Sequence, residues 1–570
     1  MPPTPMDASP EQGVTTFTGW SWAEIDPYYR DLSGRTLTGD SVHQFLANWT
    51  WVSERVSETQ SRLRVATTQN TADQEAERLY HSFLDEIFPA AQAAEQRLKE
   101  HLLASGLEPA GFEVPLRKMR ADAAIFREAN LPLFSEEQKL IIQHNKILGA
   151  QTVRWDGREV TLSQLRPVYQ HADRAIRERA WRLAMDRQLT DRNAIGDLWL
   201  RLLTLRRRIA ANAASGDYRA FKWQQLHRFD YTPEDCRHFH RAIEQVVVPA
   251  AGRVYERRRR RLGVSTLRPW DLDVDPLGPP LVPFREAAEL EKGAATIFHR
   301  VDPRLGAYFD RMMREELLDL ANRKHKGPGG YCATFAAVKR PFIFMNAVGL
   351  HQDVQTLLHE AGHAFHVFER NGLPYLPQRQ VGSEFSEVAS MAMELLAAPY
   401  LAASEGGFYS DADAARARVE HLEKMILFWP YMAVVDAFQH WVYEHPAAAD
   451  SRQCGATWAS LWGRFMPGVD WSGLGDAAAT GWQRKHHIHT VPFYYVEYGL
   501  AQLGSEQVWG NALRDQAAAV ASYRRALACG GTLSFPELYA QAGARFAFDA
   551  ATLEEAIGLI EGTLARLDPE

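Results

Sequence analysis

The sequence has few cysteines, no long apolar run and no excess of positive charge. Its four cysteines among 570 residues, Cys236, Cys332, Cys454 and Cys529, include no CxxC pair. This spacing indicates neither a disulfide framework nor a thiolate metal site. No apolar run reaches the ~18 residues that a membrane span needs, and residues 1–15 lack the basic and apolar regions of a secretory signal. We therefore expect a cytoplasmic protein that does not bind membranes.

The charge balance argues against a nucleic-acid-binding protein. The formal net charge is −7, and 24% of the residues are charged while 46% are hydrophobic, as in ordinary globular proteins. The strongly basic run Arg257–Arg261 is expected to be a solvated helix face with ion pairs. A chain of 570 residues is too long for one simple core. We expect a disordered N-terminus at 1–15, an N-terminal helical region at 16–200 and a larger helical region at 201–570.

The periodicity of apolar residues predicts a mainly α-helical chain with little β structure. Helices are predicted at 41–66, 73–105, 112–130, 135–149, 161–212, from Thr232 onward, 285–301, 303–322, 353–372, 383–396, 411–445, 454–465, 476–483, 493–503, 505–528, 534–543 and 551–567. The Asp156-Gly157 pair predicts a small hairpin across 153–160. The β-prone runs 331–335 and 341–345 predict a two-stranded element just before the helix at 353–372.

The stretch HEAGH at 359–363 carries the clearest chemical signal. In a helix, His359 and His363 lie one turn apart, about 40° from each other around the axis, on the side away from the apolar stripe. Two such imidazoles can hold one zinc ion at about 2.0–2.1 Å. Glu360 then lies beside the metal, where a general base acting on a water molecule belongs. Asp353 is expected to be the N-cap of this helix.

The predicted helix at 383–396 offers a third ligand. Its polar side carries Glu384, Glu387 and Glu394. Two histidines and one glutamate leave a fourth position of zinc open, which is the arrangement of catalytic sites. Glu387 follows His363 at a distance that allows one reversal of the chain and one further helical turn. We therefore take Glu387 as the preferred ligand, with Glu384 as its rival.

Four blocks of sequence carry a resemblance to a known family. They are HEAGHAFH at 359–366, SEFSEVASMAMEL at 383–395, GPGGYCATFAAVKRPFIFMN at 327–346 and HIHTVPFYYVEYGLAQLG at 487–504. Together they resemble the thimet oligopeptidase and oligoendopeptidase F family of zinc metallopeptidases, and the oligoendopeptidase F branch is the closer one. The resemblance implies a multi-helical, zincin-type (gluzincin) peptidase with a small β element beside the HExxH helix and a deep central channel. It also implies cleavage of internal bonds in short oligopeptides.

The resemblance extends to the metal ligands. The FSE–VASM frame matches the family's glutamate ligand at Glu387. The resemblance therefore implies one zinc ion per chain, held by His359, His363 and Glu387, with Glu360 as the general base. Zinc suits two histidines and a glutamate, although manganese or cobalt could replace it.

The block at 487–504 is expected to bind substrate and to stabilise the oxyanion, as its counterpart does in the resembled family. The residues carried over are His487, Tyr495 and Tyr498, with His486, His489 and Tyr494 as rivals in the same block. The preceding block adds glycines that let a substrate backbone approach closely. The expected substrate contacts are Gly329, Gly330, Tyr331, His489 and Tyr494.

Two other functions fit the same residues. A carboxypeptidase or dipeptidyl carboxypeptidase would use the same zinc centre and would add a cation that clamps the C-terminal carboxylate. A non-catalytic peptide-binding protein would tolerate loss of Glu360 or of a metal ligand, and all of these residues are present. The expected partners are oligopeptide substrates, without nucleic acid or membrane, and both a monomer and a homodimer remain open.

Overall fold

The structure is a computed structural model that describes residues 16–323, 325–327 and 329–568. The predicted disorder of 1–15 lies outside the described residues. The chain forms two compact units, each assembled from three separate stretches of sequence. Within the described residues, the first unit comprises 16–128, 282–411 and 504–546, and the second comprises 129–281, 412–503 and 547–568. The sequence position 200, expected as a domain boundary, lies inside the second unit.

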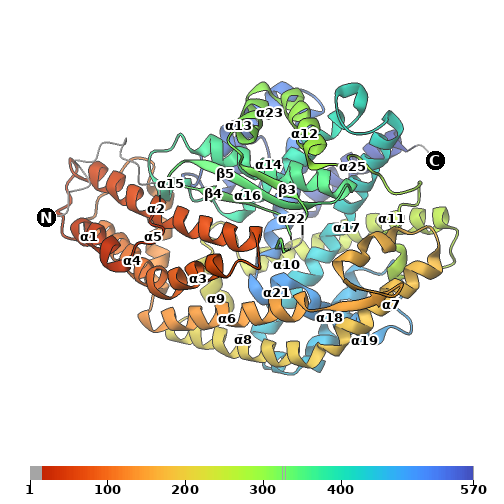
Figure 1. The fold of residues 1–570 in the computed structure, drawn as a ribbon, viewed down its shortest axis with the longest axis horizontal. Helices are drawn as coiled ribbons and strands as arrows, with labels where there is room; N and C mark the ends of the chain where they lie inside the picture. Colours follow the sequence, from red (N-terminus) through yellow and green to blue (C-terminus); the bar gives the residue numbers. More distant parts are fainter. Residues whose placement is uncertain (1–15, 324, 328, 569–570) are drawn as a thin grey trace. The chain divides into compact units, whose positions relative to one another are not determined.

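The first unit combines a helical N-terminal part with the segment that contains HEAGH (Figure 1). Its helices and strands are α1 Trp22–Ser33, α2 Val42–Gln69, α3 Gln74–Ser82, α4 Phe88–Ala104, α5 Glu113–Ile125, α12 Ala287–Val301, α13 Pro303–Arg314, β3 Leu318–Ala321, β4 Tyr331–Phe335, β5 Arg340–Ala347, α14 His351–Arg370, α15 Leu376–Arg379, α16 Ser383–Ala397, α23 Gln516–Ala528 and α24 Phe535–Gln541. The N-terminal helices share an aromatic core that includes Phe45 and Trp49.

The β element of the first unit has three strands in the order β3-β5-β4 and packs beside α14 (Figure 1). β4 and β5 pair antiparallel, from Tyr331 opposite Phe344 to Phe335 opposite Arg340. The two predicted strands are therefore confirmed. The predicted helix at 303–322 is wrong at its end, because α13 stops at Arg314 and β3 pairs in parallel with β5. Glu316 has a positive φ of 53°, which ends the helical path before β3.

The helices α14 and α16 are in close contact at Gly362. A Cβ atom added to Gly362 would lie 2.4 Å from the carbonyl oxygen of Ala389 and 2.6 Å from Cα of Ser390. Glycine is therefore needed for this approach of two backbones. The predicted N-cap Asp353 is wrong, because the helix begins at His351. Asp353 instead closes the first turn, where its Oδ2 accepts the backbone N–H groups of residues 348 and 350 at 2.8 and 2.9 Å.

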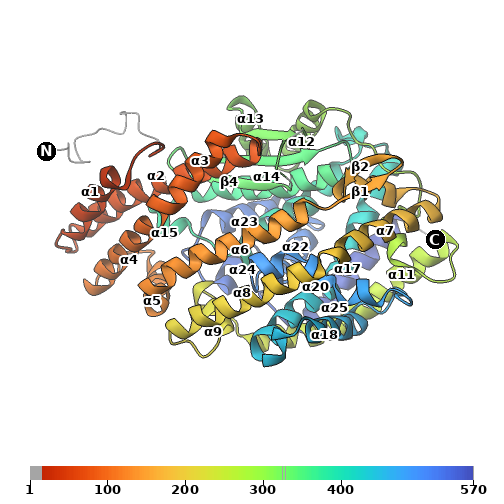
Figure 2. The ribbon, with the colours of Figure 1, turned by 60° about the horizontal axis from the view of Figure 1, so that its bottom comes forward.

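The second unit is helical apart from one hairpin. Its elements are α6 Leu131–Gly149, β1 Thr152–Trp155, β2 Arg158–Thr161, α7 Arg174–Thr190, α8 Arg192–Asn212, α9 Tyr218–Gln225, α10 Pro233–Ala242, α11 Val248–Leu262, α17 Asp411–Glu444, α18 Ser451–Phe465, α19 Gly475–Ala479, α20 Gly481–Arg484, α21 His486–Thr490 and α25 Ala550–Leu567. Figure 2 shows α6 and α8 side by side and the hairpin near α7. The hairpin turns at Asp156-Gly157, as predicted. Thr232 caps α10, also as predicted, because its hydroxyl accepts the N–H of Asp235.

The predicted helix break at Gly504 is wrong. A single helix, α22, runs through it from Tyr495 to Ala512, and α23 begins at Gln516. Gly504 leaves room for the ring of Tyr539, whose Cε1 would lie 2.5 Å from an added Cβ. The glycine therefore serves the packing of this helix rather than its termination.

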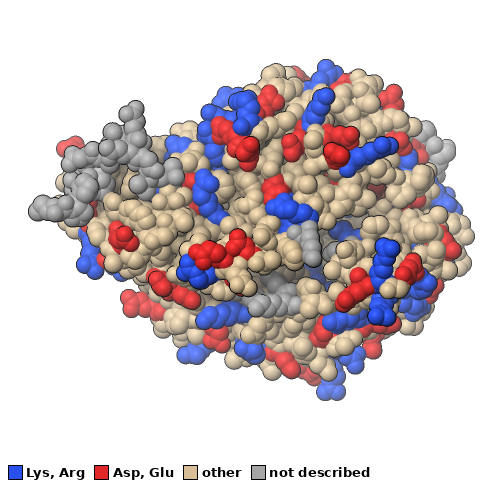
Figure 3. Space-filling model, in the orientation of Figure 1, with Lys and Arg blue, Asp and Glu red and all other residues tan. Residues whose placement is uncertain are grey.

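Charged side chains of both signs are interspersed on the face drawn in Figure 3. The basic run of α11 follows this pattern, and the ion pairs expected for it are confirmed. Its arginines pair with acidic residues as follows: Arg257 with Glu423, Arg259 and Arg260 with Glu256, and Arg261 with Asp568. Among the described residues, no helix combines the length and apolar character that a membrane crossing requires.

The close contact at Gly362 leads to a stability prediction. Gly362→Ala should lower the free energy of unfolding by about 1–3 kcal/mol, because the added methyl meets backbone atoms that cannot rotate away. Gly558→Ala is the matched control, since Gly558 also lies inside a helix and an added Cβ there meets nothing within 4 Å. That control should raise stability by up to ~1 kcal/mol through helix propensity. Chemical denaturation measures both, and equal effects at the two positions would contradict the packing argument.

Candidate metal centre and active site

The two histidines of α14 and one glutamate of α16 point their polar atoms at one another. The Nε2 atoms of His359 and His363 lie 3.4 and 3.5 Å from the same oxygen, Oε2 of Glu387. Ligands about 2.0–2.1 Å from a zinc ion lie about 3.3–3.4 Å apart at a tetrahedral angle. Among the described residues, these three form one of two groups whose donor atoms lie within 4.8 Å of one another. The spacing of this group therefore fits one small cation.

Further contacts fix the orientation of these side chains. His359 Nδ1 donates to Oε1 of Glu394, 2.7 Å away, so the lone pair of its Nε2 faces Glu387. The hydroxyl of Ser390 donates to Oε2 of Glu387 at 2.9 Å. A carboxylate behind a ligating histidine is a common feature of metal sites, where it sets the tautomer and raises basicity.

The charges of the cluster shift the pKa values of its members. Burial alone would raise the pKa of Glu387, but His363 and His359 outweigh it and hold this pKa well below its usual range. Burial alone would lower the pKa of His359, but Glu387 and Glu394 outweigh it and raise this pKa. Protons and a metal ion compete for the same donor atoms, so binding of a cation here releases protons.

Glu360 lies beside this group on α14 without joining it. The side chain is buried, and burial raises the pKa of Glu360, although the imidazoles of His359 and His363 act in the opposite direction. A carboxylate whose pKa is moved toward neutrality is suited to accept and return a proton. Cys332 of β4 is near enough that the charge of Glu360, together with burial, raises the pKa of its thiol.

The rival ligand Glu384 and the neighbouring histidine His366 are both buried. Glu384 is buried in the first turn of α16, and its backbone carbonyl accepts the hydroxyl of Tyr539 at 3.0 Å. His366 is buried against Phe385, with ring centroids 6.2 Å apart, and burial lowers its pKa well below the usual value. Among the described residues, neither belongs to the group of donor atoms formed by His359, His363 and Glu387.

The predicted substrate contacts of the first unit lie at the start of β4. A Cβ added to Gly330 would lie 3.1 Å from Cγ2 of Thr356, so Gly330 runs close beside α14. Gly329 has a φ of 92°, and a Cβ added there would meet nothing within 4 Å. The hydroxyl of Tyr331 is 2.5 Å from the hydroxyl of Thr68, and its ring stacks on Phe344. The hydroxyl of Tyr331 is therefore already hydrogen-bonded within the protein.

In the second unit, α21 and the start of α22 bring one histidine and three tyrosines together. The ring of His487 has centroid distances of 5.2 Å to Tyr495, 6.0 Å to Tyr498 and 6.1 Å to Tyr494. Burial raises the pKa of Tyr495 well above its usual value, so its phenol stays protonated. The Nζ atom of Lys485 donates to this phenol oxygen at 2.8 Å, and burial lowers the pKa of Lys485 to about 8.

The two rival histidines lie apart from the tyrosines. His489 is fully buried and stacks against Trp482 and His144, with centroid distances of 5.8 and 4.2 Å. Its position indicates a packing role. His486 is half-buried and its Nδ1 lies 3.1 Å from the hydroxyl of Thr490 within α21.

Sequence reasoning assigned no role to two residues of these clusters. Glu394 lies seven positions after Glu387, which places it on the same face of α16, and this spacing could have revealed it. Lys485 precedes the histidines of α21, but its contact with Tyr495 crosses the turn between two helices. Helical spacing gives no signal for a contact of that kind.

The comparisons with known proteins cover both units. PZ peptidase A, solved with an inhibitor, is 27% identical over 96% of this chain and 98% of its own, with a TM-score of 0.90. An X-ray structure assigned as oligoendopeptidase F is also 27% identical, over 97% and 99% of the two chains, with a TM-score of 0.90. A Bacillus anthracis structure assigned likewise, at 24% identity and a TM-score of 0.86, supports the fold. No curated protein sequence matches the chain.

The predicted mainly α-helical peptidase fold and the oligoendopeptidase F branch are confirmed by these likenesses. The sequence model of Peptidase family M3 matches residues 168–558, a range that includes HEAGH, Glu387 and the block at 487–504. This match covers more than half of the chain, and so the chain is a peptidase that belongs to Peptidase family M3.

Proposed function

We propose that this peptidase hydrolyses internal bonds of short oligopeptides with one zinc ion held by His359, His363 and Glu387. The observation that carries the proposal is the convergence of two Nε2 atoms on one carboxylate oxygen at 3.4 and 3.5 Å, beside a buried Glu360. This donor set suits zinc, and the spacing matches a tetrahedral site. A zinc ion bound there supplies Lewis acidity to a water molecule and to the peptide carbonyl.

Glu360 has the role of the proton carrier. Its carboxylate takes the proton of the attacking water and later gives a proton to the leaving amine. The raised pKa of Glu360, caused by burial, makes its carboxylate a stronger base and so favours the first transfer. Glu394 holds His359 by the hydrogen bond to Nδ1 and so keeps the lone pair of Nε2 directed at the metal position.

The group of His487, Tyr495 and Tyr498 is proposed to bind substrate and to donate hydrogen bonds to the carbonyl oxygen as negative charge develops on it. Protonated phenols suit this task, and burial keeps Tyr495 in that form. Lys485 donates to the oxygen of Tyr495, which leaves the phenol hydrogen available for another acceptor. Tyr494 and the glycines Gly329 and Gly330 are proposed to contact the substrate backbone. The deep channel and the cytoplasmic location remain predictions.

The role of Glu360 is tested by the change Glu360→Gln. The amide cannot accept the proton, so the turnover number for a peptide substrate should fall by about 10²–10⁴-fold. The zinc content should equal that of the wild type, because Glu360 holds no metal. Hydrolysis is measured with a fluorogenic peptide and metal by elemental analysis. A variant that keeps more than about a tenth of the wild-type turnover would contradict the assignment.

The choice between two glutamates is tested by metal content. Glu387→Gln should bind one zinc ion fewer per chain than the wild type and lose hydrolysis, since the amide is a weak ligand for zinc. Glu384→Gln, a matched change one turn away on α16, should bind as much zinc as the wild type. Elemental analysis of both proteins decides the assignment, and the reverse pattern would transfer the ligand role to Glu384.

The position of the cut separates an endopeptidase from a carboxypeptidase. A peptide library with amidated C-termini should be cleaved at the same internal bonds as the free acids, because internal cleavage needs no terminal carboxylate. Mass spectrometry of the products with and without chelator reads out the result. Loss of cleavage on amidation would overturn the endopeptidase proposal in favour of a carboxypeptidase.

A further inference from the structure

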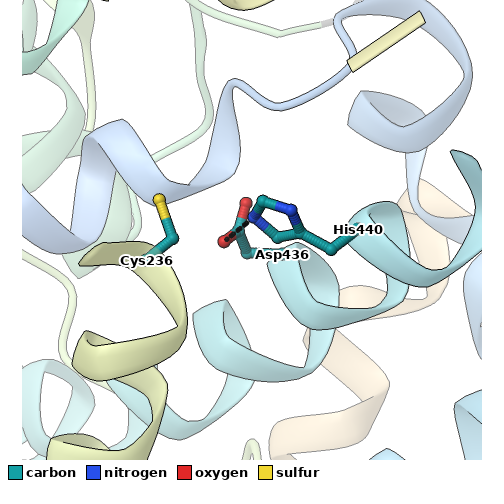
Figure 4. Close-up of side chains that lie close together, drawn as sticks. All are labelled: Cys236, Asp436 and His440. Carbon is teal, nitrogen blue, oxygen red and sulfur yellow. Dashed lines mark ion pairs between the residues drawn. The ribbon is translucent and has the colours of Figure 1, made fainter. Parts of the chain in front are cut away.

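A second group of metal-ligating side chains lies inside the second unit, on two helices. Cys236 comes from α10, and Asp436 and His440 come from α17, four positions apart. Figure 4 shows the carboxylate of Asp436 between the cysteine and the imidazole. The thiol, one carboxylate oxygen and one ring nitrogen lie within 4.8 Å of one another, and all three residues are buried.

The distances in this group resemble those of the metal centre on α14 and α16. His440 Nε2 lies 3.3 Å from Oδ2 of Asp436, close to the separation of about 3.3–3.4 Å between two ligands of one tetrahedral zinc ion. His240, one turn after Cys236 on α10, lies 2.9 Å from the same oxygen. The carboxylate is thus held by a second histidine, as ligating carboxylates commonly are.

Several buried polar atoms of this group have no hydrogen-bond partner among the described residues. They are Oδ1 of Asp436 and Nδ1 of His440, while Nε2 of His440 makes an ion pair with Oδ2 of Asp436. Asp436 is 0% exposed and His440 is 3% exposed. A buried polar atom without a partner costs stability, and a charged one costs more. A cation in contact with both side chains would remove this cost.

We propose that Cys236, Asp436 and His440 form a second metal site that binds Zn²⁺. Thiolate, imidazole and carboxylate are the three donor types that zinc accepts, and soft thiolate disfavours magnesium and calcium. The sequence alone indicated no thiolate site, because Cys236 stands far from Asp436 along the chain.

A metal ion at this place would join α10 to α17 and support the tyrosine cluster. The ring of His440 packs on Phe493 with centroids 5.4 Å apart, and Oε1 of the adjacent Gln439 accepts the N–H of Phe493 at 2.6 Å. Phe493 has a φ of 66°, a conformation that a bulky residue adopts only when its surroundings enforce it. It directly precedes Tyr494. The site is therefore structural and braces the turn before α22.

Metal analysis of the full-length protein tests the proposal. The wild type, isolated with zinc in the medium, should contain two zinc ions per chain. Cys236→Ser should contain one fewer, while Cys454→Ser should match the wild type. Cys454 is a suitable control because it is also buried in the second unit and lies outside the group. A wild type with one zinc ion at most, or a Cys236→Ser protein with the wild-type content, would overturn the proposal.

Cobalt loading gives a second readout that needs no variant and no hydrolysis. In the wild type loaded with Co²⁺, a thiolate ligand produces a strong near-ultraviolet charge-transfer band, whereas two histidines and a glutamate do not. We expect the band in the wild type and in Cys454→Ser, and its loss in Cys236→Ser. Absence of the band in the wild type, or its presence in Cys236→Ser, would contradict the proposed second metal site. Neither result bears on the centre at Glu387, so the two proposals fail separately.

Discussion

The contact of α14 with α16 at Gly362 is the constraint on which the proposed metal centre depends. With a side chain at this position the two backbones would have to separate, since the carbonyl of Ala389 already lies where a Cβ would meet it at 2.4 Å. Glu387 is two positions before Ala389, less than one helical turn away, so its reach toward His359 and His363 is set by the same contact. A shift of several tenths of an ångström would move one ligand out of a tetrahedral arrangement whose tolerance is about 0.2 Å.

In the cluster of His359, His363, Glu387 and Glu394, histidines are paired with carboxylates, which lowers the cost of burying these side chains. Two imidazoles face the carboxylates of Glu387 and Glu394, and each carboxylate has a named hydrogen-bond or ion-pair partner. Among the described residues, Glu360 has no such close partner, and burial raises its pKa. The pKa values of Glu387 and Glu360 are therefore shifted in opposite directions within the same cluster. Glu387, whose pKa is held low by the two histidines, suits a cation, and Glu360, whose pKa is raised, suits proton transfer.

Much of the fold could be predicted from the sequence, because its signals are local. HEAGH, the cap at Thr232 and the Asp156-Gly157 turn each depend on residues within a few positions. The predictions that were wrong concern residues whose structure depends on partners far away in the sequence. β3 is a strand because β5 supplies a neighbour in parallel, and its own residues also fit a helix. A glycine such as Gly504 often marks the end of a helix. Here it lies inside a helix, where the absence of a side chain leaves room for the ring of Tyr539.

The two groups proposed to bind metal ions show the same limit for functional sites. In α14 the two histidines are one turn apart in one helix, so their spacing is visible in the sequence. In the second unit, a single cysteine from α10 meets an aspartate and a histidine from α17, and only the packing of the two helices brings them together. A spacing of four positions, as between Asp436 and His440, occurs often by chance. It acquires meaning when burial removes water from the donor atoms and leaves them without other partners. The physical criterion for such a metal site is therefore a buried polar group without a hydrogen-bond partner. Suitable spacing of the ligands in the sequence is needed but does not suffice.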